Sequence, residues 1–454
     1  MLSRLPFLNE GYGAEEDSWG MVLAAQNVSE SGHYEVSRLP GHPFQEFIYL
    51  LNPEGSYFYY NFLSAAFSAI AVLFFALILK TLGVKKYIIG SLALAFTPIF
   101  YVSSCYTIDY VWSLAFILVS FYSLINKKII LSGIFLGLAI GCRITSAAML
   151  IPFLIILYER TACLQINFFN FLKISASALL IAVVLFIPII NKYGPGFFVF
   201  YDQFSYPSFS KIIYKATIGV FGLVGLLGIF YAKIIALKNK FKLCPLNLYS
   251  TQPNQKFIFA LYVLFLIYII AYLRLPQKSG YIIPLIPFLI ILVAYYLNSK
   301  QFIFFCLSFI ASSFIFGVNL TDNIRGSEYS HLAIKFNISG QEVFLDPITG
   351  PVISEHSKRK QKMDFTEKVI SSTIDRKSKF VVISGWWYNE IEVKLKQKNL
   401  DIHSDKFVFY INKIEMENYN NLGFEIFYLP EQAGHNNEYS KINCTEIISK
   451  PFPL

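Results

Sequence analysis

Residues 129–143 read Ile-Ile-Leu-Ser-Gly-Ile-Phe-Leu-Gly-Leu-Ala-Ile-Gly-Cys-Arg. The stretch is almost wholly apolar up to its last residue, and Gly133, Gly137 and Gly141 recur every four residues. On a helix these glycines share one face, which lets a second membrane helix approach closely. The pattern therefore predicts a packed membrane helix that delivers Arg143 to the membrane edge.

Nine further apolar runs accompany this one along the first 320 residues. The ten runs cover residues 60–82, 87–105, 107–125, 129–142, 145–158, 172–190, 214–236, 257–274, 280–297 and 301–320. A membrane-spanning helix needs about 20 predominantly apolar residues. We therefore expect an α-helical polytopic membrane protein with about ten spans, in which the fourth and fifth runs form a tight hairpin or a broken helix.

The composition agrees with a membrane protein. Of 454 residues, 55% are hydrophobic and only 15% are charged, and the mean hydropathy is +0.51. Soluble domains contain about 25% charged residues, and 45 Phe with 30 Tyr exclude a disordered chain. The net charge of +9 comes from basic residues at the ends of apolar runs, which favours contact with lipid headgroups over nucleic acid. The six cysteines include no CxxC pair, so neither a zinc ribbon nor a disulfide framework is indicated.

Three regions follow from this organisation. Residues 1–59 form an acidic outer loop with amphipathic helices, residues 60–320 form the transmembrane domain, and residues 321–454 form a small α/β domain. In the last region, strand-like runs cover 342–345, 380–384, 406–411 and 423–429, and helix-like runs cover 364–374 and 389–398. If residues 1–59 lie outside, the inside connections carry more Lys and Arg than the outside ones. Ten spans then place the C-terminal domain on the extracytoplasmic side of the cell membrane.

The first loop carries three adjacent acids, Glu15, Glu16 and Asp17. A stripe of apolar residues at helical spacing follows from Trp19 to Ala25, and it suits a helix that lies on a membrane surface. Two interpretations of the acids remain open. They cap this helix and favour its positive N-terminal end, or one of them serves as a general base.

Three more ionisable residues stand at the predicted outer edge of the membrane, namely Asp109, Arg143 and Lys278. Such a group is costly there unless it is solvated, paired or used. Asp109 either caps the helix that starts at Tyr110 or belongs to a functional site. Arg143 and Lys278 either snorkel to the interface or bind an anion, and arginine suits phosphate because it offers two parallel hydrogen bonds.

A turn over Pro40-Gly41-His42-Pro43 precedes Glu46. His42 is either a surface histidine or a ligand. Glu46 either favours the N-terminus of a helix beginning after Pro43 or belongs to a divalent-cation site, for which Asp109 is the other candidate.

Together these residues resemble the polytopic glycosyltransferases of the GT-C class, which take a sugar from a polyprenyl-phosphate donor. The resemblance is closest to the protein O-mannosyltransferase and lipid A aminoarabinose transferase branch, and it covers about residues 10–320. The segments that carry it are Glu16-Asp17-Ser18-Trp19 with Ser37-Arg38-Leu39-Pro40-Gly41-His42-Pro43, Tyr106-Thr107-Ile108-Asp109, Gly137-Leu138-Ala139-Ile140-Gly141-Cys142-Arg143, and Lys278-Ser279-Gly280-Tyr281-Ile282-Ile283-Pro284.

The resemblance implies a membrane glycosyltransferase that modifies a glycan, lipid or protein acceptor on the outer face. Asp17 would be the base that activates the acceptor, with Glu16 as a less favoured substitute. Asp109 and Glu46 would be supporting or metal-linked acids. The family also has a membrane helix before this loop, so either the true start lies upstream of Met1 or that helix is lost.

The resemblance also implies which residues contact the donor. Arg143 and Lys278, together with Arg38, would hold the donor phosphate, and His42 and Tyr281 would lie beside the substrate. Two other functions remain as alternatives. A transporter or flippase would suit the many spans, but such proteins often contain inverted repeats and this sequence shows no internal repeat. A non-catalytic membrane scaffold would tolerate replacement of Asp17 and Asp109.

Overall fold

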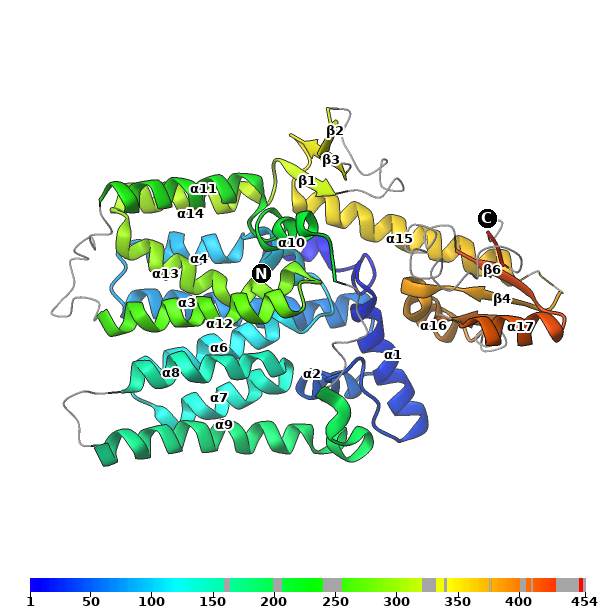
Figure 1. Ribbon diagram of the computed structural model, residues 1–454, viewed down its shortest axis with the longest axis horizontal. Coiled ribbons are helices and arrows are strands. Elements are labelled where there is room, and N and C mark those ends of the chain that lie inside the picture. Colours follow the sequence, from blue (N-terminus) through cyan, green and yellow to red (C-terminus); the bar gives the residue numbers. More distant parts are fainter. Residues whose placement is uncertain are drawn as a thin grey trace.

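The computed structural model covers residues 1–454 and describes all of them except 159–163, 199–205, 240–254, 321–331, 339–340, 375, 377, 401–405, 410, 430–448 and 452–454. A bundle of long helices forms the larger part of the molecule, and a smaller α/β part lies beyond one end of the bundle (Figure 1). This arrangement agrees with the predicted membrane protein that carries a small C-terminal α/β domain.

The bundle follows the predicted apolar runs closely. Its helices are α3 (Tyr57–Thr81), α4 (Tyr87–Ala95), α5 (Pro98–Ser103), α6 (Tyr110–Ile125), α7 (Ile129–Cys142), α8 (Leu150–Leu157), α9 (Leu164–Tyr193), α10 (Phe209–Ala216), α11 (Ile218–Lys238), α12 (Gln255–Arg274), α13 (Ile286–Tyr296) and α14 (Ser299–Ser312). Two 3-10 helices, η2 (Ile144–Met149) and η5 (Ser279–Leu285), lead into α8 and α13. Within the described residues, five helices are long and apolar enough to cross a membrane. The polytopic α-helical fold class is therefore confirmed.

The last apolar run was predicted to extend to residue 320, and this boundary is wrong. Helix α14 ends at Ser312, and residues Gly317–Leu320 form strand β1. Phe316, just before the strand, has a positive φ of 57°, a conformation that a right-handed helix cannot contain. The chain therefore leaves the bundle a few residues earlier than its hydropathy indicates.

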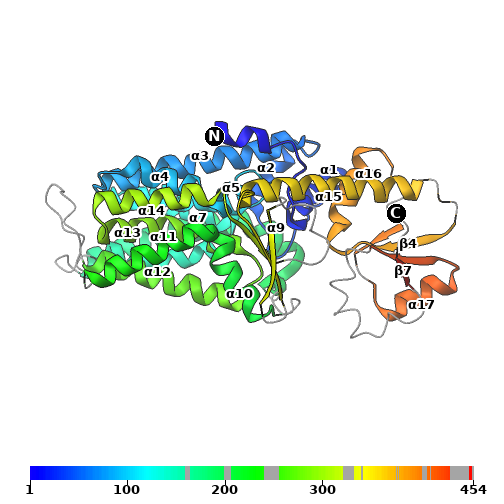
Figure 2. The same cartoon turned by 90° about the horizontal axis from the view of Figure 1, so that it is seen from above.

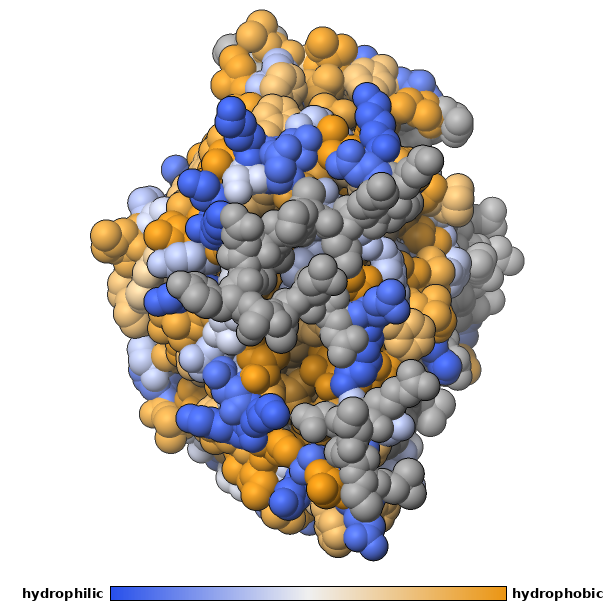
Figure 3. Space-filling view, turned by 90° about the vertical axis from the view of Figure 1, so that its left-hand side faces the viewer, coloured by the Kyte–Doolittle hydropathy of each residue, from blue (hydrophilic) through white to orange (hydrophobic). Residues whose placement is uncertain are grey.

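The two ends of the bundle differ in chemistry. The connections from α3 to α4, from α6 to α7 and from α13 to α14 lie at the end away from the α/β part (Figure 1). Exposed lysines lie in these connections, as Lys85 and Lys128 do, or in the first turn of the next helix, as Lys300 does. Figure 3 shows this end, where hydrophilic side chains gather around the helix ends. The positive-inside rule favours the cytoplasmic side for such lysines, and the orientation of the bundle in the membrane stays a prediction.

The glycine face of α7 packs against α9, as the spacing of the glycines predicts. A Cβ atom at Gly133 would lie 2.6 Å from the Ile174 carbonyl oxygen, and one at Gly137 would lie 2.7 Å from that of Ala178. Only a residue without a side chain permits this approach. The packing fixes α7, and Arg143 follows directly at its end in an extended conformation that starts the hairpin to α8.

The N-terminal region covers the other end of the bundle. It contains η1 (Leu2–Phe7), α1 (Glu16–Ser31) and α2 (Pro43–Leu50). The stripe of α1 was predicted to lie on the membrane surface, but Trp19, Val22 and Ala25 are buried inside the protein. Helix α1 packs on α2 and on a helix of the C-terminal part, so protein takes the place of lipid against this stripe.

Among its described residues, the C-terminal part contains two sheets and three α-helices. Strands β1 (Gly317–Leu320), β3 (Gln341–Asp346) and β2 (Ile334–Ile338) form an antiparallel sheet in that order. Strands β5 (Phe407–Val408), β4 (Phe380–Ile383), β6 (Glu425–Tyr428) and β7 (Ser449–Pro451) form a parallel one. Residues of α15 (Pro351–Ile374) and α16 (Tyr388–Gln397) share one apolar cluster with β4, and α17 (Lys413–Asn421) contributes to a second one. Helix α15 runs from the bundle into this domain (Figure 2).

Candidate active site

Asp109 is the fully buried centre of a charged cluster at the end of the bundle that faces the C-terminal part. Its carboxylate accepts hydrogen bonds from Arg143 at 2.5 Å and from Arg38 at 3.1 Å. Burial alone would raise the pKa of this carboxyl, but Arg143, His42 and Arg38 outweigh it and hold the pKa below its usual value. Asp109 occupies the N-cap position of α6, as one interpretation predicts, but its side chain makes no capping bond and is bonded to the charged cluster instead.

Asp17 stands in the first turn of α1 and is bonded to two cations. Its Oδ2 atom accepts hydrogen bonds from Arg38 and from Lys278, which also donates to Glu15 at 2.7 Å. Glu15 occupies the N-cap position but makes no capping bond. The late loop is thus joined to a helix more than 250 residues earlier in the chain.

Arg38 connects the two acids, since one guanidinium nitrogen binds Asp17 and another binds Asp109. We call Asp17, Arg38, Asp109, Arg143 and Lys278 the site network. All five residues were predicted from the sequence, and the structure brings them together. Neither Arg143 nor Lys278 merely snorkels to the membrane interface, because both are bonded to carboxylates.

His42 is a buried residue that contacts the site network through Arg38. It is buried, so the interpretation as a surface histidine is wrong. Its Nε2 accepts a hydrogen bond from Arg38 at 3.0 Å, so its Nδ1 carries the proton and donates to the Cys142 carbonyl oxygen at 2.6 Å. Burial lowers the pKa of His42 to about 4 with the help of Arg38 and Arg143, against the opposing effect of Asp109. His42 is therefore neutral at pH 7 and orients Arg38.

Glu46 lies in the first turn of α2, as predicted, and organises the loop before Arg38. It accepts hydrogen bonds from the Ser37 backbone at 2.9 Å, from the Ser37 hydroxyl at 2.7 Å and from Tyr34. Glu46 and Asp109 thus each have their own protein partners. No group of three His, Cys, Asp or Glu suited to a metal occurs among the described residues, and we propose no metal at these two acids.

Two tyrosines enclose Arg143. Its guanidinium carbon lies 4.6 Å from the ring centroid of Tyr110 and 4.8 Å from that of Tyr281. Tyr281 was predicted to lie beside the substrate and does lie beside Arg143. Tyr110 was not predicted, although it directly follows Asp109, because its place at the start of an apolar helix suggested packing alone.

Comparison with known proteins identifies the fold that carries this site. No family model and no curated protein matches the chain. The crystal structure of ArnT from Cupriavidus metallidurans in the apo state is similar, with a TM-score of 0.54 and 11% identity, over 96% of this chain and 92% of that one. The chain has an ArnT-like GT-C fold. A second ArnT structure from that organism, bound to undecaprenyl phosphate, gives a TM-score of 0.45 and 17% identity over 64% of this chain and 57% of that one. The fold expected from the resemblance is confirmed.

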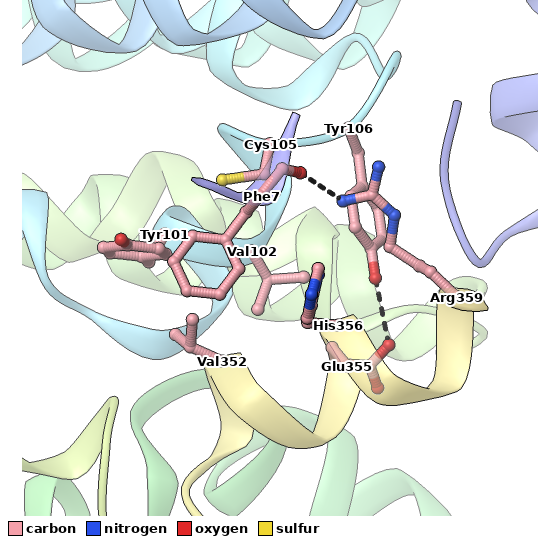
Figure 4. A pocket seen from close by; sticks show the side chains of 9 residues that line it. All are labelled: Phe7, Tyr101, Val102, Cys105, Tyr106, Val352, Glu355, His356 and Arg359. Carbon is pink, nitrogen blue, oxygen red and sulfur yellow. Dashed lines mark hydrogen bonds between the residues drawn. The ribbon is translucent and has the colours of Figure 1, made fainter. Parts of the chain in front are cut away.

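In this ArnT-like fold the C-terminal part holds the first loop in place. The buried Arg359 of α15 donates hydrogen bonds to the carbonyl oxygens of Phe7 at 2.8 Å, Glu10 at 2.8 Å and Gly11 at 2.7 Å. Figure 4 shows Arg359 beside the Tyr106 ring, around a small pocket between α5 and α15. The backbone before Asp17 is therefore fixed by a residue that the sequence patterns did not single out.

Glu16 meets the C-terminal part directly. Its Oε1 accepts a hydrogen bond from the Asn389 amide at 3.3 Å. Burial raises the pKa of Glu16 from its ordinary value of 4.5 to about 7, although Lys278, Lys362 and Arg38 oppose this. Glu16 thus faces α16 rather than the site network, which makes it a poorer candidate for the base than Asp17.

The raised pKa of Glu16 predicts a pH dependence of stability. A carboxyl whose pKa is higher in the folded chain stabilises the protein fully below its unfolded pKa of about 4.5, and this contribution is lost as the pH rises through about 7. We expect Glu16→Gln to reduce the fall in Tm between pH 5 and pH 8 by about 1–3 °C. The exposed Glu54 gives the matched control, Glu54→Gln, which should retain the wild-type slope. Equal slopes for all three proteins would contradict the assignment.

Proposed function

We propose that the chain is an integral-membrane glycosyltransferase. It transfers a sugar from a polyprenyl-phosphate donor to a hydroxyl group of a glycan, lipid or protein acceptor at the outer face of the membrane. The observation that carries the proposal is the site network, in which two carboxylates and three cations meet at one end of an ArnT-like bundle. The undecaprenyl phosphate bound in one ArnT structure is consistent with a donor of this lipid class.

Asp17 is the base in this proposal. Its side chain is 16% exposed, whereas that of Asp109 is fully buried and holds Arg38 and Arg143. A base must reach the proton that it removes, and only Asp17 of these two acids meets solvent. Asp109 is then a positioning residue that keeps the two guanidinium groups in place.

The transfer is a single displacement. The acceptor hydroxyl gives its proton to Asp17, and its oxygen forms the new bond to the anomeric carbon. The bond from that carbon to the phosphate oxygen breaks, and its electron pair leaves with the polyprenyl phosphate. Arg143 and Lys278 stabilise the negative charge on the leaving phosphate, and the anomeric centre is inverted.

The pairing within the site network suggests the order of these events. Arg38, Arg143 and Lys278 are each bonded to a carboxylate, and Lys278 is bonded to Asp17 itself. An arriving phosphate therefore competes with Asp17 for Lys278. As Lys278 turns toward the phosphate, Asp17 loses one cation and becomes a stronger base, so donor binding prepares the acceptor step.

The test follows the release of free polyprenyl phosphate. Wild type and Arg143→Gln are purified in detergent and incubated with crude polyprenyl-phosphate sugars and a membrane acceptor extract. We expect release by wild type and a loss of about 10- to 100-fold in the variant, since it lacks one charge-assisted contact to phosphate. The variant Lys128→Gln, which removes an exposed charge at the opposite end of the bundle, should behave as wild type.

Two outcomes would overturn all or part of the proposal. If wild type releases no lipid phosphate across a broad donor panel, the transporter and scaffold functions move ahead. If Arg143→Gln releases as much as wild type, the transfer reaction stands but the phosphate lies elsewhere.

A further inference from the structure

Tyr110 carries a buried hydroxyl group that has no hydrogen-bond partner among the described residues. The side chain is only 2% exposed. Buried polar groups are nearly always bonded, and one that is not costs free energy. An orphaned hydroxyl beside a charged cluster is therefore a candidate to bind a polar ligand.

Two cations of the site network, Lys278 and Arg38, lie close enough to this hydroxyl to interact with it electrostatically. Glu15, which is bonded to Lys278, and Tyr281 also interact with it. The guanidinium of Arg143 covers the face of its ring. Any anion held between Arg143 and Lys278 would thus come within reach of Tyr110.

The loop of Lys278 closes over the same ring. A Cβ atom at Gly280 would lie 2.6 Å from Cδ2 of Tyr110, so glycine is needed for this approach. The rings of Tyr110 and Tyr281 meet edge to face with centroids 6.1 Å apart. These contacts hold the Tyr110 ring firmly, so its hydroxyl has little freedom to find another partner.

The charges explain why an uncharged hydrogen-bond donor would help to bind phosphate here. The three cations of the site network already have carboxylate partners, so a phosphate gains each of them only by competition. The Tyr110 hydroxyl has no partner to lose among the residues that the structure describes. We propose that Tyr110 is a further ligand of the donor lipid and that its hydroxyl donates a hydrogen bond to a phosphate oxygen. This inference rests on the proposed function and adds a residue to its phosphate site.

The variant Tyr110→Phe tests the proposed hydrogen bond, because it removes only the hydroxyl oxygen and keeps the ring. The probes are polyprenyl phosphate without sugar and the corresponding polyprenol, whose binding to the full chain is measured in detergent. We expect the Kd for polyprenyl phosphate to rise about 10- to 100-fold, as for the loss of one hydrogen bond to a charged group, and the Kd for polyprenol to stay unchanged. The Tm of the ligand-free variant should not fall, because no protein contact of the hydroxyl is lost.

Tyr60→Phe is the matched control. The Tyr60 hydroxyl donates to the Asn52 carbonyl oxygen at 2.7 Å, so this variant should lose stability without weakening phosphate binding selectively. Unchanged binding to Tyr110→Phe would show that the hydroxyl holds only water, and equal weakening of both lipids would show a purely structural role. Either result overturns the inference. If Arg143→Gln also binds polyprenyl phosphate as wild type does, the phosphate lies elsewhere, and the assignments of Arg143 and Tyr110 fail together while the transfer reaction itself stands.

Discussion

Replacing Asp17 by asparagine is expected to lower sugar transfer by about 10³-fold while leaving the protein folded. General bases contribute about 10²- to 10⁴-fold to rate, and an amide cannot accept the acceptor's proton at neutral pH. The measurement is the release of free polyprenyl phosphate by purified wild type and Asp17→Asn, with Tm as the check of folding.

The pairing of the cations explains why this variant should fold. Without the Asp17 charge, Arg38 retains Asp109 at 3.1 Å and Lys278 retains Glu15 at 2.7 Å. No buried cation is left without a carboxylate. Since Lys278 no longer has to leave Asp17, binding of polyprenyl phosphate should be retained or tightened, so a loss of transfer would belong to the chemical step.

Glu16→Gln is the matched control for this experiment, because Glu16 is the adjacent acid and faces Asn389. It should retain most of the activity. Robust release by Asp17→Asn would mean that Asp17 is not the base, and loss of release in Glu16→Gln alone would move that role to Glu16.

Much of the fold could be predicted because a membrane imposes simple rules. The ten apolar runs contain the helices or broken helix pairs of the bundle, although the last run continues past α14 into β1, and the glycines before Arg143 indicated the packing on α9. Helices that alternate in direction bring every second connection to the same end. This alternation is enough to place Asp109, Arg143 and Lys278 near the first loop.

The sequence did not reveal which cation binds which acid. Arg38 bridges Asp17 and Asp109 because the loop before it is folded by Glu46 and Ser37, an arrangement without any periodic pattern. The burial of His42 behind Arg38 was missed for the same reason. Such pairing depends on tertiary contacts between distant loops.

The role of α15 was also beyond prediction. Arg359 lies in a polar, strongly charged stretch that resembles a solvated helix, yet it is buried against the carbonyl oxygens of residues 7, 10 and 11. Backbone carbonyls as partners leave no signature in the sequence. The lesson is that a buried arginine can be identified only when its acceptors are placed in space.

Replacing Asp109 by asparagine should have a different effect from the same change at Asp17, because it should destabilise the folded protein. Within the described residues, Asp109 is the carboxylate bonded to Arg143, whose guanidinium is enclosed by Tyr110 and Tyr281. Removing one partner of a buried ion pair costs about 3–5 kcal/mol, since the other charge stays desolvated. We expect a clear fall in Tm for Asp109→Asn and loss of transfer.

A double variant separates the two causes of this loss. In Asp109→Asn combined with Arg143→Gln, the unpaired buried cation is gone, so part of the Tm should return, with a coupling of about 1–3 kcal/mol between the two changes. Transfer should stay absent, because the proposed phosphate ligand is missing. If Asp109→Asn is as stable as Asp17→Asn, the carboxylate does not hold Arg143, and the positioning role of Asp109 has to be abandoned even where activity is lost.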